Sequence, residues 1–574
     1  MFTRRSILGS VSAASFVLAS NSVTALAASP LSAVVTLNGQ TFTYNETSGR
    51  DLGNFVSAIG GFTLRCIRCD VAGSPLTVLF RPDVNSDRAE VVFELGRVFS
   101  GTPANLRAYS VSIYRGGAFL AKVDVPAHYW FSRWRWQSSQ RPIVGNVEHL
   151  IGQGLLPPYH PTSAAAPSVP APVTSTLNCV LDLSKQKVCS TTSSTPLVAT
   201  AADLLKSFVS YTVMGLAGIT AYMPQTGERD DIGLVTESQA QYLITGAQAP
   251  LDCWRAQAEG AGTVPWHLRD ENTNAPVNFR TYPTATMYAT GSANPLIKQT
   301  TSPVTVDAAH MPALAYVPYL LTGDPYHRED LQFQANYCWG ALPPGYRPSI
   351  PQSRAFAWYL RSLAQWARIT PAAVPSWLLP QSYWFGFLEQ HRQYLEANYV
   401  NSPNPVRAMF RSTGDIDNGR NEARAPGGTW IDPWQEEFVA AVIGWIVSMG
   451  FSNWQTTFDW KIGSTLARTG TSSGWIRAQA TPYRVILRSS PRAPIVGSWA
   501  EAWALTAQVA QLKYRNRDSW VDTDMTYLTY SRGALAYANK LGNPAVTENL
   551  SWATNQLVSN GWKIPYKWRF GLGF

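Results

Sequence analysis

Hydrophobic and polar positions follow two different periods along this chain, and the change falls near residue 200. Between residues 31 and 130, short runs rich in β-branched and aromatic residues alternate with turn residues. The clearest runs cover 33–37 before Asn38-Gly39, 76–80, 90–95, and 109–114 before Arg115-Gly116-Gly117. Asn-Gly and Gly-Gly pairs are typical of tight hairpin turns. The pattern predicts an antiparallel β-sandwich within residues 29–136.

From residue 201 to 574, apolar residues recur with helical spacing, which predicts a series of amphipathic helices. The sequences YLITG at 242–246 and YLLTG at 319–323 each close a predicted helix, as in stacked helical hairpins. We therefore expect a C-terminal (α/α) toroid. The predicted helices cover 201–221, 235–245, 311–322, 328–341, 353–369, 382–399, 434–449, 454–468, 498–514, 523–541 and 545–559.

Long connections separate the predicted hairpins, at 246–310, 400–433 and 469–497. Long loops in a compact helical domain are usually functional. Between the two domains, residues 137–200 are rich in Pro, Ser, Thr and Ala, which predicts an extended connector along the surface.

Residues 1–28 have the composition of an export signal. Arg4-Arg5 precede an apolar stretch, and Ala25-Leu26-Ala27 offers small residues for cleavage. The two arginines favour the twin-arginine route over an ordinary Sec signal. No later apolar run reaches the roughly 20 residues of a membrane span. We expect a periplasmic or secreted protein without a membrane span.

The six cysteines lie outside this signal, and two local pairs are candidates for disulfides in an oxidising compartment: Cys66 with Cys69 and Cys179 with Cys189. The Cys66-Ile67-Arg68-Cys69 sequence also has the spacing of a redox or zinc site. It lies in a predicted strand and no second CxxC follows, so structural thiols or a local bridge are favoured.

Composition indicates a folded protein, since 45% of its residues are hydrophobic and only 14% are charged. Its formal charge of +9 falls by two, to +7, when Arg4 and Arg5 are removed with the signal. A modest positive excess favours an anionic partner. There is no clustered basic stripe or nucleic-acid-binding motif, so nucleic acid is not expected. An acidic polysaccharide suits an exported protein better.

The 22 tryptophans include several beside polar residues, as in Trp266-His267 and Trp430-Ile431-Asp432-Pro433-Trp434. Flat aromatic faces suit sugar rings, and neighbouring Arg or Asp can bind hydroxyls and carboxylates. Most tryptophans are nevertheless expected to fill space between helices, and only a few to line a groove.

Charged, histidine and tryptophan residues gather in the loops that precede the predicted helices. In a toroid, the starts of the inner helices converge at one rim, where free N–H groups favour anionic ligands. Singly, the acids could be helix caps, His310 a core histidine and Arg354 a structural partner. The candidate site residues in these loops are Arg229, Asp231, Trp266, His267, Arg269, Asp307, His310, Arg354, Trp430, Asp432, Trp434, Glu436 and Trp499.

Two reactions could use such residues. In β-elimination from a uronate, a base removes the C5 proton, a cation stabilises the enolate, and an acid protonates the leaving oxygen. The candidates are His310 or His267 as base, Tyr316 or Tyr222 as acid, and Arg229, Arg269 or Arg354 on the carboxylate.

Hydrolysis instead needs two carboxylates that flank the glycosidic bond. Asp231 with Asp432 or Glu436 is the candidate pair. The histidines are scattered and no HExxH sequence is present, so no metal is expected. No P-loop, Rossmann fingerprint or G-x-S-x-G elbow is found, and we expect no cofactor.

With its β-rich N-terminal part, its helical hairpins and these loop residues, the chain resembles secreted (α/α)-toroid carbohydrate-active enzymes. That class includes polysaccharide lyases and glycoside hydrolases, many with an attached β-sandwich. The resemblance covers about 31–130 and 200–574 and implies the class of activity, not individual roles. It is similar to the lyases in offering His, Tyr and Arg together. β-Elimination on an acidic polysaccharide is the first expectation, hydrolysis the second, and a non-catalytic glycan-binding or envelope-assembly role the third.

Overall fold

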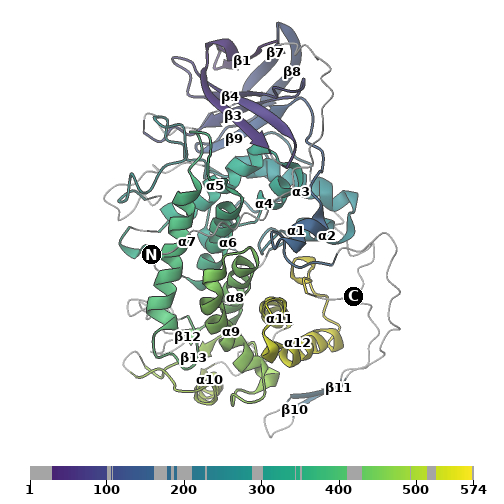
Figure 1. Cartoon of the computed structure of the whole chain (residues 1–574), viewed down its shortest axis with the longest axis vertical. Coiled ribbons are helices and arrows are strands. Elements are labelled where there is room, and N and C mark those ends of the chain that lie inside the picture. The colour runs from purple at the N-terminus through teal and green to yellow at the C-terminus, as the bar shows by residue number, and fades with distance from the viewer. Residues whose placement is uncertain are drawn as a thin grey trace, which may run out of the picture.

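The structure is a computed structural model in which nine strands form two antiparallel sheets at one end and helices form the remainder (Figure 1). The predicted export signal, 1–28, lies outside the described residues. The described residues are 29–57, 59–99, 105–106, 108–160, 178–181, 187–190, 210–225, 229–286, 302–342, 344–348, 352–409, 430–490, 493–513 and 525–571.

The four-stranded sheet has the order β2-β1-β7-β8, and the five-stranded sheet has the order β3-β4-β5-β6-β9. All neighbouring strands in both sheets are antiparallel. The strands are β1 (Leu31–Leu37), β2 (Gln40–Asn45), β3 (Arg50–Ser57), β4 (Phe62–Asp70), β5 (Thr77–Pro82), β6 (Ala89–Leu95), β7 (Tyr109–Arg115), β8 (Ala118–Val125) and β9 (Ser132–Gln137).

The two hairpin turns that the sequence predicts are present. Asn38 and Gly39 have φ of 51° and 76°, and Gly116 and Gly117 have φ of 56° and 83°. Positive φ at both central residues is the turn geometry that matches the twist of the flanking strands. The four clearest predicted runs correspond to β1, β5, β6 and β7, and the strand expected around Cys66–Cys69 is β4, whereas the other four strands were not assigned from the sequence.

The five-stranded sheet is covered on both faces, and for this reason β5 and β6 are buried along their whole length. Phe80 and Phe93 share a core with Val35 of the four-stranded sheet. On the other face, Leu79 packs with Tyr319 of the helical region. Alternation along each strand separates the two environments.

Twelve α-helices occur in the described residues (Figure 1). Most lie within a few residues of the predicted bounds. They are α1 (Val147–Gly152), α2 (Glu237–Thr245), α3 (Gln248–Gly260), α4 (Tyr316–Thr322), α5 (Pro325–Gly340), α6 (Ser353–Ile369), α7 (Gln381–Leu395), α8 (Pro433–Ser448), α9 (Gln455–Thr469), α10 (Trp499–Lys513), α11 (Met525–Lys540) and α12 (Thr547–Ser559).

Two expectations about the helices are wrong. Residues 210–221, the described part of the first predicted helix, are irregular. Met214 and Ala217 there have φ of 61° and 47°, which a right-handed helix does not allow. Conversely, α3 lies where a long loop was expected. Its proline, Pro250, is in the first turn, where a missing N–H costs little.

The segment 141–160 runs along the helical region instead of standing apart from it. Trp445 Nε1 on α8 donates to Gly154 O at 2.9 Å, and Tyr159 Oη donates to Lys567 O at 2.9 Å. Further on, β10 (Asn178–Leu181) and β11 (Lys187–Ser190) pair so that Cys179 lies opposite Cys189. Residues 161–177 and 191–200 of the predicted connector lie outside the described residues.

Cys66 and Cys69 are free, buried thiols on β4. Burial raises the pKa of Cys66 to about 11 and that of Cys69 to about 12, so neither is a reactive thiolate at neutral pH. The two residues are structural thiols, and the disulfide considered between them is not formed, because their side chains enter different cores. Within the described residues, no helix combines the length and apolar character needed to cross a membrane.

A buried ion-pair network joins the five-stranded sheet to α3 and α5. Glu329 accepts from Arg133 Nη1 at 2.8 Å and Arg269 Nη2 at 3.1 Å, and it also pairs with Arg81. Arg81 of β5 and Arg133 and Arg135 of β9 face the helices. Side chains alternate along a strand, so their neighbours, such as Trp134, enter the sheet core. The network comprises Arg81, Arg133, Arg135, Arg269, Glu90, Glu94, Glu259, Asp324, Glu329 and Asp330.

This network predicts acid sensitivity. Burial by itself raises the pKa of Asp324, but the neighbouring positive charges, that of Arg135 first among them, together outweigh burial and lower the pKa to about 2. Arg81, Arg133 and Arg269 likewise hold the pKa of Glu329 below its usual range. A carboxyl with a depressed folded-state pKa stabilises the fold above its unfolded-state pKa of about 4. We expect the urea concentration at the midpoint of unfolding to be constant near neutral pH and to fall as the pH drops from about 4 towards 2. A midpoint unchanged across that interval would contradict the network's role.

Candidate functional site

Several of the predicted site residues meet where α6, α8 and α11 begin. We call this group the Asp307–His310 cluster. Three of its members, Asp231, His310 and Trp434, are buried, and the others are half-buried. The cluster consists of Arg229, Asp231, Asp307, His310, Arg354, Asp432 and Trp434.

The central pair forms within one short turn. Asp307 precedes the 3-10 helix Ala308–His310, and its Oδ1 accepts the backbone N–H of Ala309 at 3.0 Å. Its other oxygen, Oδ2, lies 2.5 Å from Nδ1 of His310. Burial raises the pKa of Asp307, but the hydrogen bonds from His310 and Ala309 outweigh it and lower the pKa. The carboxylate thus fixes the ring with Nδ1 protonated and Nε2 as the basic nitrogen.

Nε2 of His310 has no hydrogen-bond partner among the described residues. The backbone carbonyl oxygen of His310 accepts a hydrogen bond from Nη2 of Arg229 at 2.9 Å. Arg229 also donates to Asp231 Oδ1 at 2.9 Å and to Met223 O at 2.8 Å. The guanidinium of Arg229 is therefore held in a fixed orientation against the backbone of His310.

Arg354 provides a second guanidinium at the start of α6. It lies over the ring of Trp434, with Cζ 5.3 Å from the ring centroid, and it interacts electrostatically with Asp307 and Asp432. Burial lowers the pKa of Arg354, and its Nε has no hydrogen-bond partner in the part of the chain that is described. It is a cation with spare hydrogen-bonding capacity.

The first turns of α6 and α8 touch each other directly. The backbone N–H of Arg354 donates to Gln435 Oε1 at 3.2 Å, and Ser353 Oγ donates to Glu436 Oε1 at 3.1 Å. Tyr527, in the first turn of α11, stacks on Trp434 with centroids 5.7 Å apart. The three helices therefore start at the same end of the molecule, so their positive dipole ends add.

Buried donors fix the loops that carry the cluster. Arg361 of α6 donates to the carbonyls of Gly233, Met311 and Pro312. Burial lowers the pKa of Arg361 to about 9, which still leaves it protonated at neutral pH. Lys567 Nζ donates to Ile232 O at 2.8 Å. The loops are positioned by the framework and not by solvent, as a preorganised site requires.

Asp432 accepts Nε of Arg484 at 2.7 Å, and this arginine lies over Trp430 with Cζ 4.6 Å from the ring centroid. Tyr483 packs beside Trp434 with centroids 6.2 Å apart. Neither Tyr483 nor Arg484 was a candidate from the sequence. Their only sequence signal is their place in the long 469–497 connection.

Other candidates lie elsewhere. Trp266 is in the main core, and Trp499 is in a separate core with Trp475. His267 uses both ring nitrogens, with Nε2 2.6 Å from Asp330 Oδ1 and Nδ1 3.2 Å from Phe131 O. Burial lowers the pKa of His267, and no nitrogen of it is available to a substrate.

Arg269 is bound to Glu94 and Glu329 in the interface network. Tyr316 donates to Leu155 O at 2.9 Å, and burial raises its pKa, so it is a weak acid. Glu436 accepts Lys461 Nζ at 2.6 Å and Met409 N at 2.8 Å. The side chains of Arg269, Tyr316 and Glu436 therefore stabilise the fold where they lie.

Among the described residues, no group of three or more His, Cys, Asp or Glu side chains is placed to hold a metal ion. Comparison of the chain with protein-family models, curated proteins and solved structures gives no match. The function therefore has to be argued from the geometry of the site.

Proposed function

We propose that this protein is an exported enzyme that cleaves an acidic polysaccharide by β-elimination at the Asp307–His310 cluster. The observation that carries the proposal is an imidazole oriented by Asp307, with Nε2 unpaired among the described residues, beside Arg229 and Arg354. A positioned base and a nearby cation are what proton removal next to a carboxylate requires.

In the proposed reaction, Nε2 of His310 takes the C5 proton of a uronate residue. The C5–H electron pair forms the C4–C5 double bond, and the C4–O bond breaks. Arg354 and Arg229 stabilise the negative charge that builds on the carboxylate. The imidazolium of His310 then returns its proton to the leaving oxygen, since Tyr316 donates to Leu155 instead.

Hydrolysis is the weaker alternative because each candidate carboxylate already has a cationic partner. Asp231 pairs with Arg229, Asp432 with Arg484 and Glu436 with Lys461. A hydrolase needs one protonated acid and one free base, and a paired carboxylate stays ionised. A glycan-binding role without turnover is favoured only by the aromatic group of Trp434, Tyr483 and Tyr527.

We further propose that the two sheets form a sandwich and that the helices form an (α/α) toroid. The shared core of the two sheets supports the sandwich. For the toroid, α6, α8 and α11 begin at one end, and the C-terminal segment returns to α2, where Glu237 accepts the backbone N–H groups of Tyr566 and Lys567. That contact joins the last hairpin to the first.

The substrate's carboxylate provides the direct test. Without it the C5 proton is not acidic, whereas hydrolysis does not depend on it. We expect the enzyme to cleave a uronate polymer and to leave the same polymer uncut after its carboxyl groups are reduced to alcohols. Equal cleavage of both polymers would overturn β-elimination.

Arg354→Gln should raise KM about tenfold or more and also lower kcat, because the guanidinium binds the carboxylate in the ground state and stabilises the enolate. A charge-assisted hydrogen bond contributes roughly 1.5–3 kcal/mol, which corresponds to at least a tenfold effect. Steady-state kinetics on a uronate polymer measure it. Arg65→Gln, in the exposed Arg65–Asp51 pair, is the matched control and should change neither constant.

A further inference from the structure

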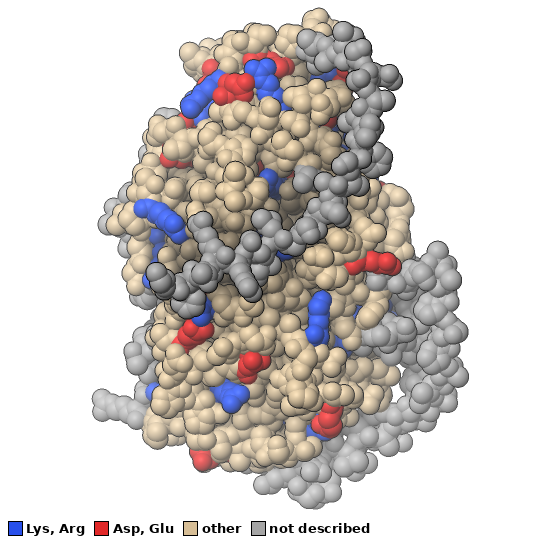
Figure 2. Space-filling view, viewed as in Figure 1, with Lys and Arg blue, Asp and Glu red and all other residues tan. Residues whose placement is uncertain are grey.

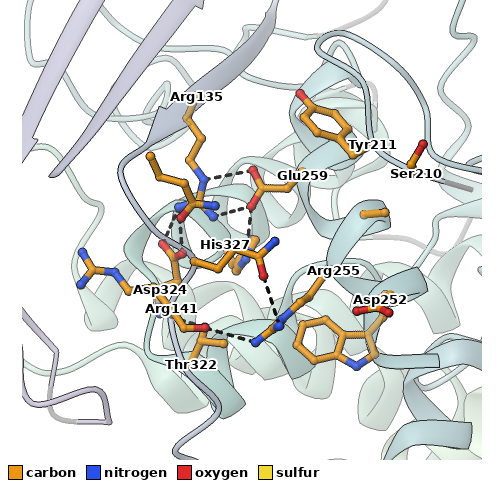
Figure 3. Close-up of a pocket in the computed structure, with 14 residues that line it drawn as sticks. Arg135, Arg141, Ser210, Tyr211, Asp252, Arg255, Glu259, Thr322, Asp324 and His327 are labelled. Atoms are coloured by element: carbon orange, nitrogen blue, oxygen red, sulfur yellow. Dashed lines mark hydrogen bonds and ion pairs between the residues drawn. The ribbon is translucent and has the colours of Figure 1, made fainter. Parts of the chain in front are cut away.

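A second polar site lies away from the Asp307–His310 cluster and shares no residue with it. It is a cavity of about 300 Å³ between the end of β9, helix α3 and the start of α5 (Figure 3). Sequence analysis did not find it, because α3 was assigned to a loop. Most of the residues that line it have polar or charged side chains, and Trp254 and Ala256 add apolar surface.

The floor of the cavity is built and fixed. Arg135 Nη1 donates to Asp324 Oδ1 at 2.8 Å, and its Nε donates to Glu259 Oε2 at 3.0 Å. Behind them, Glu90 also accepts from Arg135 at 2.8 Å. Arg135 and Asp324 are buried, so these groups keep their positions whether or not a ligand is present.

The mouth carries more open groups. Asp252 and Arg255 of α3 are half-buried, and Gln140 is exposed. Arg255 Nη1 donates to Gln140 Oε1 at 3.2 Å, and Asp252 Oδ1 accepts Gln248 Nε2 at 2.7 Å. Asp252 and Arg255 lie next to each other on α3, so the mouth offers a carboxylate and a guanidinium side by side (Figure 3).

Charges in the lining balance. Three guanidinium groups face three carboxylates, so the cavity has no net attraction for an ion of either sign. A hydroxyl group, which both donates and accepts, can bond to either kind of side chain. The six charged lining residues are Arg135, Arg141, Arg255, Asp252, Glu259 and Asp324.

His327 adds an imidazole ring to the lining of the cavity, with Nε2 4.0 Å from Glu259 Oε1. Its side chain lines the cavity and is only 4% exposed, and Nδ1 has no hydrogen-bond partner among the described residues. Buried polar atoms in folded proteins are nearly always bonded. Burial lowers the pKa of His327, so the ring is neutral at neutral pH and one of its nitrogens is an acceptor.

We propose that this cavity binds a single neutral sugar unit through its hydroxyl groups. Its volume is at the lower limit of small-molecule sites, which span roughly 300–1,000 Å³, and this suits one ring better than a chain. Dense charge-assisted hydrogen bonds to hydroxyls give such a site its specificity. The proposal does not rest on β-elimination at the Asp307–His310 cluster.

Isothermal titration of the mature full-length protein with glucose, galactose and mannose tests the ligand class. Each sugar is compared with its uronate and its amino sugar, which differ mainly in charge. At least one neutral sugar should bind, with its charged analogues at least fivefold weaker. No binding by any neutral sugar, or tighter binding of a charged analogue, would overturn the proposal.

Asp252→Asn and Arg255→Gln test the location, because both residues lie at the mouth and leave the floor intact. Each should weaken sugar binding at least tenfold, as expected for loss of one charge-assisted bond. Arg65→Gln should leave binding unchanged. If the two mouth variants bind normally while Arg354→Gln does not, the sugar occupies the other cluster and the proposal fails. Turnover of a uronate polymer should persist in both mouth variants, which separates this site from the proposed active site.

Discussion

His310→Ala should lower kcat on a uronate polymer by about 10²–10⁴, the usual contribution of a positioned general base. Among the described residues, Asp307 is the one side chain bonded to the ring, through Nδ1, which leaves Nε2 as the unpaired imidazole nitrogen of the cluster. Alanine removes that nitrogen and leaves Arg229 bonded to the backbone carbonyl of residue 310. Substrate binding should therefore be nearly unchanged, and the loss should appear in kcat. Steady-state kinetics, with thermal melting to confirm folding, measure the effect.

Asp231→Asn is the matched variant in the same cluster. It keeps the shape of the side chain and weakens only its pairing with Arg229. We expect it to retain much of the activity if β-elimination is right. The opposite order, with Asp231→Asn inactive and His310→Ala active, would point to hydrolysis and contradict the assignment of His310 as base.

Glu329→Gln should destabilise the fold by about 3–5 kcal/mol, the range for breaking a buried ion pair. Glu329 is fully buried and neutralises guanidinium groups from β5, β9 and the segment before α4, namely those of Arg81, Arg133 and Arg269. The amide removes the carboxylate that the three guanidinium groups share and leaves each of them with its second carboxylate alone, Glu90, Asp330 or Glu94. Urea unfolding followed by tryptophan fluorescence measures the change.

Arg65→Gln again provides the control, since the Arg65–Asp51 pair is about half-exposed on both sides. An exposed pair contributes about 0–1 kcal/mol because solvent screens it. A Glu329→Gln change as small as that of the control would show that the network does not hold the sheet against the helices.

The hairpin turns and most helices were predictable because their signals are local. Asn38-Gly39 determines its turn without reference to the rest of the chain. By contrast, β9, in which Arg and Trp alternate, was not assigned as a strand from the sequence. Arg and Trp alternate because the two faces of the sheet have different surroundings. Trp134 stacks on Phe93 in the sheet core, whereas Arg133 reaches carboxylates on α5.

The candidate site was predictable only in part. Residues at helix starts, such as Arg354 and Asp432, converge because neighbouring helices run in the same direction, and a helical repeat already implies that. Trp266-His267 had the same local appearance but follows α3, and it packs against β9 instead. Sequence could not distinguish the two cases, because only tertiary contacts decide which loop faces the sheet.

The positions of the charged residues were also predictable only in part. The formal charge of +9 favours an anionic partner, although the sequence has no clustered basic stripe. On the face shown in Figure 2, Lys and Arg are scattered among mostly uncharged residues and do not form a continuous patch. Many arginines are instead buried. Some belong to the interface network, and others, such as Arg361, donate hydrogen bonds to loop carbonyls. Recognition of a polyanion is therefore expected to depend on the few guanidinium groups at the cluster.

The most direct measurement is to incubate the mature protein with a panel of acidic and neutral polysaccharides, following reducing ends and ultraviolet absorbance together. The account predicts that both signals rise in step on a uronate polymer, because each β-elimination creates one reducing end and one unsaturated uronate. Reducing ends without the absorbance would mean hydrolysis, and neither signal on any polymer would mean a binding protein. Either result would contradict the proposed role of the Asp307–His310 cluster.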